Sequence, residues 1–465
     1  MNLRTAGSLA IAGCLLLGFA SQAYADRYIV LYKKNAVPAD AVSAAKAAGG
    51  RIVGRINRLG IAIADSGRKD FAVRMAADGR VKSVGIDPAT AVPRHSSRRA
   101  RVARSAPAAG PTAADDLFNV GLVWGIERVH APQAWDAGAT GSHDTVVAVI
   151  DTGIAWNHPD LAPNVLHAAC YTSEGSVVGF DTTSGPCNPY PTLSDHGTHV
   201  AGTVAAAFGG GRVVGVGPDL GLASYNTFEL IEDCGVCTFS SVRWVAMLDA
   251  AARGYEVINM SLGGVSAFGQ GKGTNELATF VAAEKRVANA VVKAGTTIVA
   301  AAGNNGLDLN GIYINTPGGV PATVNVGATG IRPEPRYQPG VSYDVRAFYS
   351  NFGAAIDVVA PGGDCGEPDG CDAVLPNWFE YLVLSSVVAP APGCGSTASC
   401  PVGYGWKGGT SMASPHAAGV VGLIRDENPS LSAAKAAKEL KRTAERLGDR
   451  QAFGHGMVDA RAALD

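Results

Sequence analysis

The stretch His196-Gly197-Thr198-His199-Val200-Ala201-Gly202 decides how this chain is interpreted, because it opens a helix of small residues with a histidine. A second stretch, Gly409-Thr410-Ser411-Met412-Ala413-Ser414-Pro415-His416, opens another such helix with a serine. Upstream of both, Val149-Ile150-Asp151-Thr152-Gly153 ends an apolar run with a carboxylate. The three stretches supply an acid, a base and a nucleophile, which is the set of groups that nucleophilic catalysis requires.

Short apolar runs alternate with segments of helical periodicity around these stretches. Strands are predicted at 145–150, 222–227, 257–260, 297–301, 323–326 and 356–359. Helices are predicted at 198–207, 240–252, 277–293, 411–425 and 433–446. Strands that are apolar on both faces and alternate with helices indicate an α/β fold, with a parallel sheet flanked by helices. Catalytic groups gather at the carboxyl ends of such strands, where Asp151 lies.

Residues 1–25 have the pattern of a secretory signal peptide. Arg4 precedes an apolar run over residues 6–20, and Ala23-Tyr24-Ala25 provides a cleavage site before Asp26. We therefore expect the protein to be secreted. Cys14 stands in a lipoprotein-like box, which leaves a lipid-anchored form as the minor alternative. No other stretch is long and apolar enough to span a bilayer.

The segment that follows the leader has an organisation of its own. Residues 26–92 predict the order β-α-β-β-α-β of a small α+β ferredoxin-like unit. Residues 93–114, rich in Arg, Ala, Ser and Pro, predict a cleavable linker, and residues 115–465 form the remaining domain. Residues 26–114 carry 17 basic and 6 acidic side chains, whereas residues 115–465 carry 20 and 34, so we expect the two parts to attract each other. The basic residues lack aromatic interleaving, which argues against a nucleic-acid partner.

Eight of the nine cysteines follow the leader. In the oxidising compartment that export implies, an even number favours four disulfides. Their order suggests the local bridges Cys170 to Cys187, Cys234 to Cys237, Cys365 to Cys371 and Cys394 to Cys400. The Cys-x-x-Cys spacing of the second pair also suits a redox motif or half of a zinc site, although no second such pair completes a zinc set.

Each catalytic motif has a plainer explanation when it is taken alone. Asp151 at a strand end could cap a helix or a turn, and Ser411 could be an ordinary serine of a first helical turn. His196 and His199 share one helical face, as metal ligands do, but no zincin-type glutamate and third ligand accompany them. Gly209-Gly210-Gly211 follows a helix rather than a strand, which favours a flexible turn over a nucleotide-binding loop.

Together, the three stretches resemble those of the subtilisin-like serine proteases, the subtilases, from about residue 117 to the C-terminus. The order Asp, His, Ser is that of subtilisin itself. The resemblance implies that Ser411 attacks the peptide carbonyl, that His196 acts as general base and that Asp151 orients the imidazole. Asn304, in Ala300-Ala301-Ala302-Gly303-Asn304-Asn305-Gly306, matches the asparagine that binds the oxyanion. Pro415 is expected in the first turn of its helix, where a missing N–H costs nothing.

A further stretch, Ile258-Asn259-Met260-Ser261-Leu262-Gly263-Gly264, resembles the family's substrate edge. There an extended polypeptide adds as an antiparallel strand, which makes little demand on its sequence. Ser261, Leu262 and Gly263 are therefore expected to bind substrate, with Gly263 leaving room for the P1 side chain. Asn315 is expected at the floor of the P1 pocket, and the lack of an evident acidic residue there argues against a preference for Arg or Lys.

Two departures from the family pattern lie near the active-site motifs. Asp160 matches an acidic calcium ligand of many subtilases, but Phe208-Gly209-Gly210-Gly211-Arg212 lacks the side-chain oxygen of the corresponding loop. Whether a structural calcium ion binds thus stays open, and the hydrolysis of a peptide bond by this set of residues requires no cofactor. The stretch from Gly362 to Gly408 is longer than in the family and carries four cysteines, so we expect a disulfide-pinned surface loop beside Ser411.

The unit over residues 26–92 resembles the family's propeptide, which assists folding and then blocks the substrate groove. We expect it to inhibit its own enzyme, to be removed by self-cleavage between Pro93 and Asp116, and the enzyme to be a monomer. The rival hypothesis is a catalytically inactive subtilase scaffold that acts as a binding module, against which the complete set of catalytic positions argues. The acid-active sedolisins replace the base by a glutamate, and the intact His196 motif argues against that type.

Overall fold

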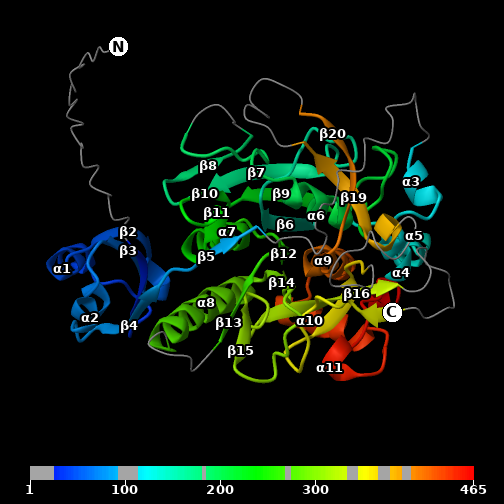
Figure 1. Cartoon of the computed structure of the whole chain (residues 1–465). Helices are drawn as coiled ribbons and strands as arrows, with labels where there is room; N and C mark the ends of the chain where they lie inside the picture. Colours follow the sequence, from blue (N-terminus) through cyan, green and yellow to red (C-terminus); the bar gives the residue numbers. More distant parts are fainter. Residues whose placement is uncertain are drawn as a thin grey trace, which may run out of the picture.

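The computed structural model describes residues 26–92, 114–180, 185–267, 274–331, 344–364, 378–389 and 400–465. An N-terminal unit, residues 26–92, precedes a large unit that begins at residue 114 (Figure 1). The expected signal peptide and nearly all of the expected linker lie outside the described residues. Within the described ranges, no helix combines the length and the apolar composition needed to cross a membrane.

The N-terminal unit has the predicted β-α-β-β-α-β order. Its strands form an antiparallel sheet in the order β2-β3-β1-β4. The elements are β1 (Asp26–Tyr32), α1 (Ala41–Ala48), β2 (Arg51–Ile56), the short η1 (Asn57–Leu59), β3 (Ile61–Ser66), α2 (Phe71–Ala76) and β4 (Val81–Ile86).

Strand β1 is buried on both faces, which accounts for its continuous apolar run. Val30 packs with Phe71 of α2, whereas Ile29 and Leu31 belong to the same hydrophobic cluster as Phe280 of α8 (Thr274–Ala294) in the large unit. Successive side chains of a strand point to opposite faces. The sheet of the N-terminal unit therefore lies between its own two helices and the large unit.

The large unit is built on a mostly parallel sheet. Within the described residues its nine strands follow the order β17-β16-β14-β12-β6-β9-β7-β8, with β18 also paired to β16. Only β17 and β8 run antiparallel to their neighbours. The strands are β6 (Val146–Asp151), β7 (Val165–Tyr171), β8 (Ser176–Val178), β9 (Gly221–Asn226), β12 (Val257–Met260), β14 (Thr297–Ala301), β16 (Thr323–Ile331), β17 (Asp344–Arg346) and β18 (Val358–Pro361).

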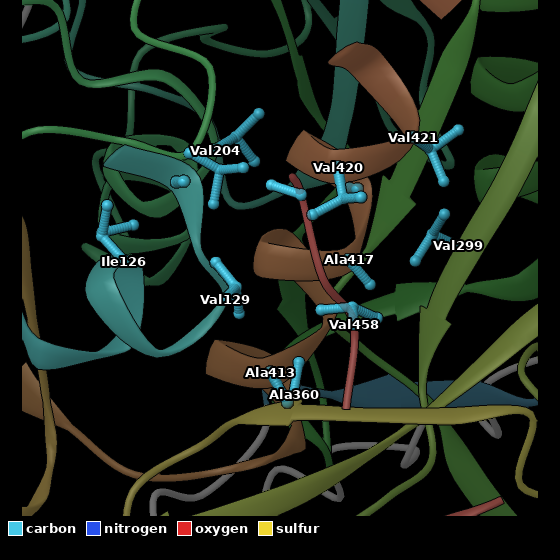
Figure 2. Close-up of a cluster of buried hydrophobic side chains, with 14 of the residues drawn as sticks. Ile126, Val129, Val204, Val299, Ala360, Ala413, Ala417, Val420, Val421 and Val458 are labelled. Carbon is cyan, nitrogen blue, oxygen red and sulfur yellow. The ribbon is translucent and has the colours of Figure 1, made fainter. Parts of the chain in front are cut away.

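Helices cover both faces of this sheet, as the apolar strands predicted. Val149 of β6 packs in the cluster that holds α6 and α9, and its neighbour Ile150 packs in the cluster that holds α7 and α8. Figure 2 shows Ala417 and Val420 of α9 between Val204 of α6 and Val299 of β14. The helices of the large unit are α3 (Asp116–Asn119), α4 (Trp124–Arg128), α5 (Ala131–Asp136), α6 (His196–Ala205), α7 (Ser240–Ala252), α8, η4 (Trp378–Tyr381), α9 (Thr410–Glu427), α10 (Ala433–Thr443), α11 (Arg450–Phe453) and η5 (Ala462–Leu464).

The stretch between Gly362 and Gly408 differs from the expected surface loop. Its described part contains an antiparallel hairpin of β19 (Val383–Val388) and β20 (Val402–Lys407), and every residue of β19 is buried. The hairpin packs on α6, where the Ser385 hydroxyl donates to the carbonyl of His199 at 2.8 Å. The expectation of a surface loop is wrong for this hairpin, because its apolar residues complete the core beside α6; residues 365–377 and 390–399 lie outside the described ranges.

Two small sheets, one of three strands and one of two, lie outside the nine-stranded sheet. A three-stranded sheet has the order β10-β11-β5, and a two-stranded sheet joins β13 to β15. Their strands are β5 (Ala89–Ala91), β10 (Glu229–Ile231), β11 (Gly235–Phe239), β13 (Gly264–Ala267) and β15 (Tyr313–Thr316). Strand β5 comes from the end of the N-terminal unit and pairs with β11 of the large unit (Figure 1).

Candidate active site

Asp151 is the last residue of β6 and is fully buried at the carboxyl edge of the sheet. Its Oδ1 atom accepts hydrogen bonds from the backbone N–H of Thr152 at 2.8 Å and from Nδ1 of His196 at 2.7 Å. The second contact fixes the tautomer of the imidazole, since Nδ1 must carry the proton that the carboxylate accepts. This leaves Nε2 as the basic nitrogen of a neutral His196.

The contact between Asp151 and His196 depends on a glycine. His196 is the first residue of α6, and a Cβ atom on Gly197 would lie 2.5 Å from the carbonyl oxygen of Gly153. The Gly197 N–H also donates to the hydroxyl of Thr152 at 2.9 Å. Any side chain at this position would push α6 away from the end of β6. The glycine after the histidine is therefore required for helix α6 to approach the end of strand β6.

Ser411 is the second residue of α9 and lies beside the end of β12. Its hydroxyl donates to the carbonyl of Ser261 at 3.0 Å, and the Ser261 hydroxyl donates to the carbonyl of Ser411 at 2.7 Å. Because β12 is the sheet neighbour of β6, Ser261 and Asp151 follow adjacent strand ends. The sheet thus brings the beginnings of α6 and α9, which pack against each other, to one edge.

Pro415 was expected in the first turn of α9. That expectation is wrong, because Pro415 is the sixth residue of this helix. A residue there would normally donate its N–H to the carbonyl of Ser411, four residues earlier. Proline lacks this N–H, and the hydroxyl of Ser261 supplies the missing hydrogen bond instead. Ser261 therefore helps to hold the backbone of the nucleophile, which its position in the substrate edge alone did not indicate.

Asn304 follows β14 and shares a cavity with Ser411. Its Oδ1 atom accepts hydrogen bonds from the Thr410 N–H at 2.9 Å and from the Thr410 hydroxyl at 2.7 Å. These two donors orient the amide so that Nδ2 is the end that can donate to another group. Such an amide beside a nucleophile can stabilise negative charge on a carbonyl oxygen.

The cavity beside Ser411 has a volume of about 370 Å³, and three of the four expected substrate residues line it, whereas Ser261 is fully buried and is not part of the lining. The three are Leu262, Gly263 and Asn315, and a Cβ atom on Gly263 would lie 2.6 Å from the carbonyl oxygen of Thr316. Asn315 is buried, as expected for a pocket floor, but its amide is engaged in two hydrogen bonds with that of Asn325, at 3.0 and 3.2 Å. The floor of this cavity is thus uncharged at Asn315, whose amide already has a hydrogen-bond partner in Asn325.

The same cavity is lined from the other side by residues 89–92 of the N-terminal unit. In the antiparallel pairing of β5 with β11, Ala91 lies opposite Cys237, and the Val92 N–H donates to the carbonyl of Val236 at 3.0 Å. The end of the N-terminal unit therefore occupies a strand position along the cavity. Sequence reasoning missed this strand and its partner, because Ala-Thr-Ala carries no periodic signal.

Both histidines of the first stretch are buried, but only His196 reaches a carboxylate in this way. His199 lies within hydrogen-bonding distance of two carbonyl oxygens, those of Val383 and Gly405, through Nε2. Burial holds its pKa well below the ordinary value, so it is neutral. His199 thus joins α6 to the β19–β20 hairpin and is no metal ligand in this arrangement.

Asp160, the expected calcium ligand, is fully buried among protein donors. Its carboxylate accepts from the Arg212 N–H at 2.9 Å and from the Ser386 hydroxyl at 3.2 Å, and the Tyr404 hydroxyl also hydrogen-bonds to it. A calcium ion needs six to eight oxygen ligands. Here the side chain of Arg212 forms an ion pair with Asp116, and the described residues contain no group of three His, Cys, Asp or Glu placed to hold a metal. This donor set does not fit calcium.

Two of the expected disulfides are present. Cys170 is joined to Cys187, and Cys234 to Cys237. Cys400 is also disulfide-bonded, while Cys365, Cys371 and Cys394 lie outside the described residues. The Cys234–Cys237 bridge belongs to the loop and strand that pair with the N-terminal unit, so this Cys-x-x-Cys does not form half of a zinc site.

Comparison with known proteins agrees with this geometry. The Subtilase family profile matches residues 142–456. Subtilisin E of Bacillus subtilis (strain 168) is 33% identical over 344 residues, which cover 73% of this chain and 70% of that protein; subtilisin of Bacillus pumilus has the same identity, and 98% of it is covered.

Solved structures share the fold as well. The epidermin leader peptide processing serine protease EpiP of Staphylococcus aureus superposes with a TM-score of 0.70 at 23% identity, over 95% of this chain and 98% of that one. Fervidolysin of Fervidobacterium pennivorans, described as a keratinolytic enzyme, gives 0.67 at 22% identity, over 95% and 61%. The chain belongs to the subtilase family and is a subtilisin-like serine endopeptidase, a hydrolase that acts on peptide bonds.

Proposed function

We propose that this endopeptidase is exported as a self-processing zymogen, with Asp151, His196 and Ser411 as its catalytic triad. The observation that carries the proposal is the position of β5, which pairs with β11 and lines the same cavity as Ser411 and Asn304. A segment of the protein's own chain thus lies where an extended substrate would lie. Polypeptides are the substrates of the active enzyme.

The triad would act through one proton that moves twice. His196, held through Nδ1 by Asp151, accepts the Ser411 proton at Nε2 as the hydroxyl attacks the peptide carbonyl. The hydroxyl must first leave the carbonyl of Ser261, to which it donates in this structure. The imidazolium, stabilised by the carboxylate, then returns the proton to the leaving amine. Water hydrolyses the acyl-enzyme by the same steps in reverse order.

Two donors would stabilise the tetrahedral intermediate. The Nδ2 amide of Asn304 is oriented by Thr410, and the backbone N–H of Ser411, in the first turn of α9, has no partner within its helix. Both groups are fixed before substrate arrives, so stabilising the oxyanion costs little reorganisation. Leu262 and Gly263 would line the adjoining part of the substrate groove, whereas the buried Ser261 would hold the backbone of Ser411 from beneath.

The N-terminal unit would inhibit the enzyme by docking on α7 and α8. Arg286 of α8 donates to the carbonyls of Leu59 and Tyr32 at 2.9 Å each. Asp87 accepts the Ser241 N–H at the start of α7 at 3.1 Å. These contacts, with the shared apolar cluster, would hold β5 on β11 until the chain is cut between Pro93 and Asp116.

Export would follow from the leader over residues 1–25. The Cys170–Cys187 and Cys234–Cys237 disulfides support this part of the proposal, because disulfides persist in oxidising compartments outside the cytosol.

The test compares the wild-type chain with Ser411→Ala. The wild type should lose its N-terminal unit during expression and react with a serine-directed fluorophosphonate at Ser411, whereas Ser411→Ala should stay intact and unlabelled. As a control, mature wild-type enzyme is added to the intact variant. Cleavage of the variant would show that its linker is accessible, so that its failure to process itself reflects the missing nucleophile. Processing of Ser411→Ala on its own would refute self-cleavage, and a processed wild type without labelling or hydrolysis would favour an inactive binding scaffold.

A further inference from the structure

The Cys234–Cys237 disulfide lies in the strand that receives the extended chain. Cys237 is in β11, fully buried, and faces Glu229 of β10 on one side and Ala91 of β5 on the other. Cys234 lies in the turn before β11. The bridge therefore closes a ring of four residues that includes the peptide groups of β11 nearest to the incoming strand.

The peptide group inside this ring makes a hydrogen bond to the bound strand. The Val236 carbonyl, between the two cysteines, accepts the Val92 N–H at 3.0 Å. A substrate that replaces β5 would meet the same carbonyl. The orientation of this one peptide group thus affects how well an extended chain pairs.

The strand beside the ring is anchored at Glu229 of β10, which accepts hydrogen bonds from the N–H and the hydroxyl of Ser173 at 2.8 and 2.7 Å, but the turn around Cys234 is mostly exposed. Strand β10 has only three residues and lies at the edge of its small sheet, and its Leu230 side chain is 72% exposed. Asp233 and Gly235, on either side of Cys234, both have positive φ angles, of 63° and 81°. A hairpin of this size is marginally stable by itself in water. Once the N-terminal unit has left, β11 also loses its pairing with β5.

We infer that the Cys234–Cys237 disulfide is a positioning element that keeps β11 ready to pair with extended substrates. This rests on the proposed function, since it assigns substrate to the strand position that β5 occupies. Binding to an ordered edge costs less conformational entropy than binding to one that must first be ordered. The disulfide is not one of the groups that transfer a proton or attack the carbonyl, so we expect it to affect substrate affinity and not the chemical step.

The experiment uses the mature enzyme with Cys234→Ala/Cys237→Ala, and with Cys170→Ala/Cys187→Ala as the matched control that removes the other disulfide. Two substrates are compared: a tetrapeptide anilide that extends along β11, and an N-acetyl amino-acid ester that occupies the P1 pocket alone. Fluorophosphonate titration gives the concentration of active enzyme for each variant. Cys234→Ala alone, which keeps the buried Cys237, replaces the double variant if the latter does not fold.

For the Cys234/Cys237 variant, we expect KM for the anilide to rise about tenfold, the factor that corresponds to ordering the backbone of one residue on binding. KM for the ester and both kcat values should stay within about twofold of the wild type, as should all values of the control. An unchanged anilide KM, or an equal rise for both substrates, would overturn the inference. A wild type that neither hydrolyses the anilide nor takes up the fluorophosphonate would instead contradict the proposed function.

Discussion

Asp87 should make the docking of the N-terminal unit depend on pH. Its side chain is buried between the two units, and Ser241 at the start of α7 donates to one of its oxygens. Burial raises its pKa from the ordinary 3.8 to about 6, and this effect exceeds the opposing influence of the Ser241 hydrogen bond and of the charges of Arg27 and Arg243. The docked state therefore binds a proton more tightly than the released state does.

The sign and the size follow from this difference in pKa. A group whose pKa rises on docking stabilises the complex below its ordinary pKa, and this contribution is lost as the pH rises through the docked value, near 6. The full shift of about two units corresponds to about 3 kcal/mol. Between pH 8 and pH 5, the affinity should rise about tenfold, because protonation is then most of the way to completion in the complex alone.

The assay is calorimetric titration of residues 26–92 into the Ser411→Ala form of the large unit, at pH 8, 7, 6 and 5. Asp87→Asn, which mimics the protonated carboxyl, should bind at pH 8 at least as tightly as the native sequence and should lose the tenfold rise. The role of Asp87 would be refuted if the native sequence and Asp87→Asn showed the same dependence of affinity on pH, or if acid weakened the native complex. Equal proton uptake in the two titrations would contradict it independently.

Three other changes test separate parts of the structure. Asn304→Ala should lower kcat about a hundred- to thousandfold with little change in KM, a magnitude measured on subtilisin itself, and steady-state kinetics on a peptide substrate would check it. Tyr404→Phe and Ser386→Ala should each lower the free energy of unfolding by about 1–3 kcal/mol, because each leaves the buried Asp160 short of a donor, and urea unfolding measures this. Gly263→Ala should raise KM roughly tenfold, since its Cβ would lie 2.6 Å from the Thr316 carbonyl and displace the groove wall; an unchanged KM would show that the wall yields without cost.

The sequence predicted the parts of the fold that follow from strong local patterns. Strand β12 and helix α7 have the predicted bounds. A short, mostly apolar run predicts a buried strand and an amphipathic period predicts a helix, and each pattern can be recognised within a single segment of sequence. Strand β5 has no such signal: Ala89-Thr90-Ala91 is extended only because β11 offers it partners. Strand β19 was hidden for a similar reason, since its burial comes from packing on α6.

In the candidate site, too, some features follow from local sequence and others depend on contacts between distant segments. The resemblance of the motifs to those of the subtilases predicted that Asp151 lies beside His196 and Asn304 beside Ser411, and the structure brings both pairs together. The contacts that hold them could not be predicted. The hydroxyl of Ser261 replaces the hydrogen bond that proline removes from α9, and this pairing joins residues 150 positions apart. Nothing in either segment alone indicates such a contact.

Under the proposed function, strand β11 would take part in both inhibition and substrate binding, and this constrains how the two can be separated. Strand β5 pairs with β11, and if an extended substrate uses the same peptide groups, a change that loosens β11 should weaken the binding of both. Asp87 contacts α7 instead and lies outside the substrate groove, so its protonation alters inhibition alone. A rise in pH from 5 to 8 should therefore weaken docking of the N-terminal unit about tenfold without lowering the affinity for substrate, whereas a change at the disulfide should weaken both.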